Sequence, residues 1–403
     1  MRRFFFALIL LALAWVPPAA KPANPLEAIV RPYAFDIPNW EVRSLLDKAY
    51  SGVKNRLTGA PKEEDAFVLG YFSDAERVRA LKAKAPELAE QDPQLYQSEL
   101  VKLDSLRQDL KQREGEVEDI VARQLASVLQ EEGLDTSFDF FGRRSFLWPP
   151  VSFQLDELPN VLIISPRDKI QLRKTYLLTS PLTPQEIEDV EHRVEELGYS
   201  ALVETIGGLA TYPSLIPQDT TLDFLLGTVA HEWLHQYFFF LPLGRNYWAN
   251  EQMTTINETA ADIAGSEIAA KLKERFYPAK KQKAQASPAP LPTSRHTFDF
   301  GREMRETRVA VEEYLRRGDV AGAESYMKER RDFLASNGYF IRRLNQAYFA
   351  FHGTYADGPA GAVSPIGGRL KELRRQKGSL GDFIKAVATI SRYDDLAKLL
   401  DKG

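Results

Sequence analysis

The sequence contains no cysteine among its 403 residues. The chain therefore forms no disulfide, offers no thiol nucleophile and cannot hold zinc through Cys ligands. The same absence excludes attachment of a lipid to a cysteine behind the N-terminal segment. Any metal site in this protein must be built from histidine, carboxylate groups and water.

The chain also has a small net charge and few histidines. The chain has 52 basic and 56 acidic residues, a formal net charge of −4, and only five histidines. This balance gives no overall attraction for nucleic acid, so we expect no nucleic-acid partner. The hydrophobic content of 44% supports a sizeable core. The length allows two domains, or one large domain with a helical appendage.

A long apolar run, from Phe4 to Val16, lies near the N-terminus. It follows Arg2 and Arg3 and precedes helix breakers and small residues, as in a secretory signal. The run is shorter than the roughly 20 residues that span a bilayer. We predict that residues 1–20 are a signal peptide for export to the periplasm or the cell exterior. The alternative is an uncleaved N-terminus that associates the protein with a membrane.

Helical periodicity dominates the rest of the chain, and the predicted fold class is α+β, predominantly helical. Residues 21–38, rich in Pro and Ala, are expected to be a tether. Asn39 is expected to cap the first helix of a helical N-terminal region over 39–136. Apolar residues recur there at three- and four-residue steps, which predicts a packed amphipathic helix; a coiled-coil dimer is the secondary interpretation, and the oligomeric state is left open.

The character of the sequence changes near Ser137. Strand-like runs at 161–165 and 170–179, and a helix that begins at Thr183 and Pro184, predict a core with a small sheet over 137–277. Two further short strands are expected around Gly207 and Gly208. A flexible insert is expected over 278–296, and a helical region that completes an active-site cleft over 297–403, with two helices closing the chain.

One apolar segment, from Thr221 to Phe240, contains the sequence His231-Glu232-Trp233-Leu234-His235. On a helix, residues four apart lie one above the other, so both imidazoles can bind one Zn²⁺. Glu232 then projects beside the metal, where it can act on water. An HExxH sequence also arises without a metal, but an apolar helix whose polar positions are two His and a Glu favours a metal site.

A third ligand is expected from the next helix, which contains Asn257-Glu258-Thr259-Ala260-Ala261-Asp262. Antiparallel packing of the two helices would place Glu258 opposite the two histidines. Asp262, one turn further on the same face, is placed to accept the Nδ1–H of a ligand histidine. Two carboxylates on a solvated helix face are the alternative, which fits poorly with the surrounding Ala and Ile residues.

The pairing of HEWLH with NETAAD resembles the gluzincins, zinc peptidases in which a downstream Glu completes the HExxH site. The resemblance covers residues 219–265. It implies a zincin-like catalytic core, one catalytic Zn²⁺ held by His231, His235 and Glu258, and Glu232 as general base. The remainder of the chain resembles no family.

These observations predict an exported zinc peptidase that acts on peptide or protein substrates. His352 and Tyr355 are the candidates for stabilising the developing oxyanion. Residues 207–212 are the candidate strand edge for a substrate backbone, with an ordinary strand or loop as the alternative. The rival hypothesis is a zinc-binding but inactive cell-envelope scaffold that acts through its N-terminal helices. Whether cleavage is internal or terminal stays open.

Overall fold

A computed structural model describes residues 24–58, 61–138, 144–278, 298–354 and 364–401. They form an α+β fold that is predominantly helical, as the sequence predicted. The helices are α2 (Pro25–Val30), α3 (Ile37–Thr58), α4 (Glu64–Gln91), α5 (Pro93–Glu131), α6 (Pro184–Glu195), α7 (Leu222–Phe239), α8 (Pro242–Arg245), α9 (Glu251–Phe276), α11 (Phe300–Arg316), α12 (Val320–Ser336), α13 (Gln346–His352), α14 (Ile366–Gln376), α15 (Leu380–Ala388) and α16 (Tyr393–Leu400), with a 3₁₀ turn η1 at Arg31–Tyr33. The strands are β1 (Asp135–Phe138), β2 (Arg144–Leu147), β3 (Phe153–Asp156), β4 (Asn160–Pro166), β5 (Lys174–Leu178), β6 (Tyr199–Thr205) and β7 (Ser214–Pro217).

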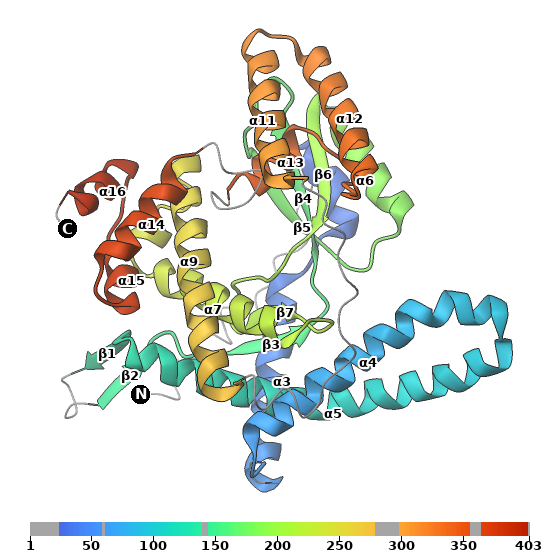
Figure 1. Cartoon of the computed structure of the whole chain (residues 1–403), viewed down its shortest axis with the longest axis vertical. Coiled ribbons are helices and arrows are strands. Elements are labelled where there is room, and N and C mark those ends of the chain that lie inside the picture. The colour runs from blue at the N-terminus through green and yellow to red at the C-terminus, as the bar shows by residue number, and fades with distance from the viewer. Residues whose placement is uncertain (1–23, 59–60, 139–143, 279–297, 355–363, 402–403) are drawn as a thin grey trace.

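The upper part of the molecule in Figure 1 is built on an antiparallel sheet of order β5-β4-β6. Its central strand β4 is an almost continuous apolar run because both of its faces are covered. Leu162 and Ile164 pack against α2 and α6, whereas Val161 and Ile163 face α13. Helices α11 and α12 pack against each other and extend this part further.

The larger core lies below and is centred on α7 and α9. It also takes in the parallel pair β3-β7, the C-terminal half of α5, and α14, α15 and α16. The other half of α5 pairs with α4 as a long helical hairpin that projects from the body (Figure 1). This core is the frame that positions the HExxH helix.

Several predicted elements are confirmed with small shifts. Helix α6 starts after Thr183, whose side chain caps it, and ends before Gly198, which adopts a positive φ of 83°. Helix α9 starts after its cap Asn250 and ends at Phe276. The helical region predicted after residue 296 begins with α11, α12 and α13.

Other expectations are wrong. The segment 21–38 is no simple tether in its described part, because Asn24 caps α2 and the buried Ile29 and Val30 pack on the upper sheet. The first long helix starts at Ile37, and the cap is Asp36, whose side chain accepts the Asn39 N–H at 3.0 Å. Three helices, α14 to α16, follow residue 363 instead of two.

The short strands were the least predictable. The hairpin β1-β2 and strand β3 were missed, and the strand expected after Gly208 lies instead at β7. The expected division into regions also differs from the packing, because α5 shares one core with α7 and α9, and the C-terminal region is split between the sheet and that core.

Two predicted segments are not assessed by the structure. The predicted signal peptide, residues 1–20, and all but Pro278 of the predicted insert lie outside the described residues. Among the described helices, none combines the length and the apolar character needed to cross a membrane.

Candidate metal centre

The two helices of the candidate site pack closely because their facing residues are small or apolar. Helix α7 begins after Thr221, whose side chain accepts the Phe224 N–H, and most of its residues are buried. On α9, a Cβ added to Gly265 would lie 3.2 Å from the backbone N of His231. The small residue at this crossing lets the α9 backbone approach the start of the HExxH sequence.

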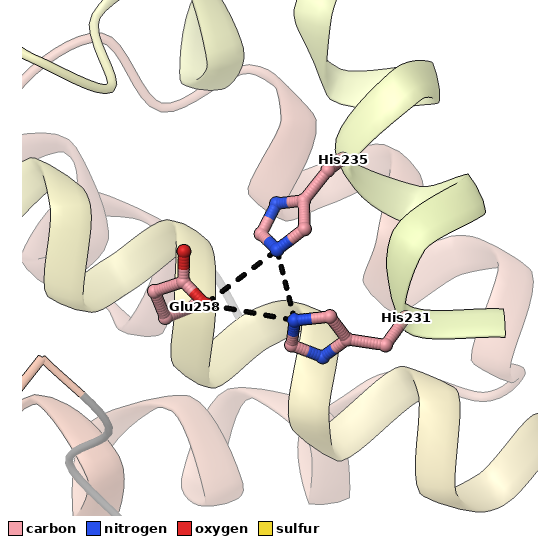
Figure 2. A group of neighbouring side chains, drawn as sticks. All are labelled: His231, His235 and Glu258. Atoms are coloured by element: carbon pink, nitrogen blue, oxygen red, sulfur yellow. Dashed lines mark hydrogen bonds and ion pairs between the residues drawn. The ribbon is translucent and has the colours of Figure 1, made fainter. Parts of the chain in front are cut away.

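This packing brings His231, His235 and Glu258 together, as Figure 2 shows. The Oε2 atom of Glu258 lies 3.5 Å from the Nε2 atom of each histidine, and the two Nε2 atoms are 2.9 Å apart. Tetrahedral Zn²⁺ with bonds of about 2.0–2.1 Å separates its ligand atoms by roughly 3.4 Å. The two distances to Glu258 match this value, and the two imidazole nitrogens lie about 0.5 Å closer together than it. The three atoms thus approximate three corners of a zinc site.

One atom of this group supports a cation independently of that fit. Glu258 Oε2 is buried and accepts no hydrogen bond from the described residues. A buried carboxylate oxygen without a hydrogen bond is costly, because burial removes the water that would otherwise donate to it. An ion bound between this oxygen and the two imidazoles would satisfy it.

The outer nitrogens of both imidazoles are held by α9. The Nδ1–H of His231 donates to Asp262 Oδ1 at 2.9 Å, and the Nδ1–H of His235 donates to Asn257 Oδ1 at 2.8 Å. A proton fixed on Nδ1 leaves the Nε2 lone pair of each ring free to face the centre. Asp262 therefore lies where the sequence predicted, next to His231.

The charges of the group support one another. Burial lowers the pKa of His231, but the carboxylates of Asp262 and Glu258 raise it more, to well above its usual range. Burial raises the pKa of Glu258, but His235 and His231 lower it more, to well below its usual range. A divalent cation that bound here would take the place of the imidazole protons next to Glu258.

Glu232 lies beside this group and is not one of its three ligand candidates. Its buried carboxylate touches the segment before α7, where a Cβ added to Gly208 would be only 2.4 Å from Glu232 Oε1. Burial raises the pKa of Glu232 above its usual value. A carboxylate whose pKa is shifted upward in this way is suited to accept and return a proton.

The two predicted oxyanion candidates are not brought to this group by any described contact. His352 ends α13, packs against Tyr348 and Phe351 at ring-centre distances of 4.2 and 5.3 Å, and its pKa is lowered by burial to about 4. Its Nε2 has no hydrogen-bond partner among the described residues. Tyr355 lies outside the described residues.

Three contacting residues were missed from the sequence. Asn257 holds His235, Gly208 makes room for Glu232, and Tyr247 donates its hydroxyl to Glu258 Oε1. Asn257 was the easiest of them to predict, because a polar residue next to Glu258 on a helix of small residues indicates a buried partner. Tyr247 lies in the connection between α8 and α9, where no periodic pattern predicts the direction of a side chain.

Comparison with protein-family models, with curated proteins and with solved structures found no match to this chain. The inference about the site therefore depends on its own geometry and chemistry.

Proposed function

We propose that this protein is an exported zinc-dependent peptidase with a zincin-like catalytic core. The observation that carries the proposal is the buried Glu258 Oε2, which faces two imidazole nitrogens and has no donor among the described residues. Two His and one carboxylate leave a fourth tetrahedral position for water or substrate, which is the ligand number of catalytic zinc sites. His231, His235 and Glu258 would hold the ion.

Zinc supplies a Lewis acid that polarises the substrate carbonyl and makes water more acidic. Glu232 accepts a proton from water, whose oxygen bonds to the carbonyl carbon of the peptide. The C–N bond then breaks, and Glu232 returns the proton to the leaving amine. Asp262 and Asn257 keep the imidazoles in the orientation that this chemistry needs. We predict that His352 or Tyr355 donates a hydrogen bond to the developing oxyanion.

The presence of Glu232 distinguishes this proposal from an inactive zinc-binding scaffold. A metal that only stabilises a fold prefers four protein ligands and needs no base beside it. Here a buried carboxylate lies next to the three ligands without joining them.

The test combines metal analysis with a mixed-peptide cleavage assay. Wild-type protein should contain about one Zn²⁺, and His235→Ala should lose it. Glu232→Gln should keep the metal and lose hydrolysis. His192→Ala is the matched control, because this histidine is 72% exposed on α6. Equal zinc content in the wild type and His235→Ala would contradict the ligand assignment, and hydrolysis by Glu232→Gln would contradict the role of the base.

A further inference from the structure

Helix α7 is mostly buried but carries an accessible stripe. At helical spacing this stripe contains Phe224, Thr228, His231, His235 and Phe239. The two phenylalanines at its ends are 45% and 67% exposed, although the rest of the helix places its aliphatic residues in the core. Phe239 also belongs to a contiguous exposed aromatic group with Phe240 and Trp148, and such groups are typical of binding surfaces.

The stripe has a defined length with the candidate metal centre inside it. Phe224 and Phe239 are separated along the helix axis by about 22 Å, from a rise of 1.5 Å per residue. An extended polypeptide covers that distance with about six or seven residues. The two histidines lie between the phenylalanines, so a chain along α7 would pass the metal centre with apolar contacts on both sides.

A backbone edge runs beside the same stripe. A Cβ on Gly207 would lie 3.5 Å from the Phe224 ring, Gly208 lies against Glu232, and the Thr211 carbonyl accepts a hydrogen bond from Gln236. Residues 207–211 thus run alongside α7 and pass Glu232, the proposed general base.

The segment also has free hydrogen-bonding groups. Leu209 exchanges two backbone hydrogen bonds with Leu215 of β7, each 2.9 Å long, and its carbonyl also accepts the Thr211 N–H at 2.8 Å. Within the described part of the chain, the backbone groups of Gly208 and Ala210 form no hydrogen bond. Alternate residues of a strand direct these groups to opposite sides, so the two form an open edge to which a peptide can add as a strand.

We propose that the α7 stripe and this edge bind an extended polypeptide segment with large apolar side chains near both ends. The scissile bond then lies inside the bound chain, which makes the protein an endopeptidase for apolar segments. The cleavage part of this inference rests on the proposed function, whereas the binding part can be measured without hydrolysis.

The binding test uses Glu232→Gln protein loaded with zinc and two end-blocked peptides of about ten residues. They share a small central sequence and carry either Leu and Phe or Ser and Gln on both flanks. Fluorescence anisotropy should show about tenfold tighter binding of the apolar peptide. Phe224→Ser and Phe239→Ser, each in the Glu232→Gln background, should each reduce that preference. Phe340→Ser, at an 86% exposed position outside the stripe, should leave it unchanged.

Equal binding of both peptides, or a preference that survives both serine substitutions, would overturn the inference. Sedimentation of the protein with anionic vesicles that is lost in the same variants, without a peptide preference, would overturn it in favour of a lipid surface. Wild-type protein should cleave the end-blocked apolar peptide near its centre. Cleavage that requires a free end would overturn the endopeptidase assignment. A binding preference without any cleavage would instead support the binding site and contradict the proposed hydrolysis.

Discussion

The side-chain oxygen of Asn257 accepts the Nδ1–H of His235 at 2.8 Å, one residue before Glu258 on the same helix. A single turn of α9 therefore supplies both a candidate ligand, Glu258, and the group that orients His235. One turn later, Asp262 accepts the Nδ1–H of His231 and orients that ring. The two helices form one unit, in which α7 provides the imidazoles and α9 provides the third ligand and both outer partners.

Replacing Asn257 by Ala should weaken zinc binding by about 10–100-fold, because the His235 ring would lose the partner that fixes its orientation and tautomer. Competition with a chromophoric chelator measures the affinity. Asn257→Asp, which keeps an acceptor at the same place, should retain more of it. An Ala variant with wild-type affinity would show that the packing of α7 alone orients this ring.

Gly208→Ala should abolish hydrolysis while zinc stays bound. The added Cβ would meet Glu232 Oε1 at 2.4 Å and Thr228 Cγ2 at 2.7 Å, so the carboxylate has to move away from its position beside the centre. Gly378→Ala, between α14 and α15, is the control, because its added Cβ would meet no atom within 4 Å. Peptide cleavage and zinc content should be measured for both variants; equal activity would mean that the exact position of Glu232 is unimportant.

Tyr247→Phe should lower zinc affinity without removing any ligand candidate. The lost hydroxyl is the donor to Glu258 Oε1, and the freed carboxylate can rotate, so Oε2 no longer has a fixed position toward the two imidazoles. The control is Tyr212→Phe, at a half-exposed residue whose hydroxyl has no described role in the group. Zinc titrations in which both variants match the wild type would contradict this positioning role.

The sequence predicted the local features of this site better than its surroundings. His231, His235, Glu258 and Asp262 could be placed because they lie on two helices, where spacing alone determines which side chains share a face. Gly208 and Tyr247 could not, because each lies in an irregular connection whose path depends on tertiary contacts.

The same difference explains the errors in the fold. Long amphipathic helices such as α5 have a strong periodic signal, and β4 is apolar throughout. Strands β1, β2, β3 and β7 have only four residues each, too few for a period to be recognised. The parallel pairing of β3 with β7 joins segments that are far apart in the chain, so the sequence of neither segment predicts it.

Protein stability should fall between acidic and neutral pH because of Glu114 on α5. Burial, with smaller contributions from Glu118 and Asp156, raises the pKa of this carboxyl from 4.5 to about 7 against the opposing effect of Lys111. The folded protein therefore holds this proton more tightly than the unfolded chain does. The resulting stabilisation is full below about 4.5 and is lost as the pH rises through about 7, with an upper limit of about 3 kcal/mol.

Glu114→Gln keeps a neutral side chain at every pH, so it should lose part of this pH dependence and be more stable than the wild type at pH 8. Urea denaturation at several pH values between 5 and 8 measures the free energy of unfolding. A residual slope of the same sign is expected from Glu118, whose pKa is also raised by burial. Asp104→Asn, on an exposed position of the same helix, is the control and should follow the wild type. Parallel curves for Glu114→Gln and the wild type would show that this carboxyl is already ionised in the folded protein.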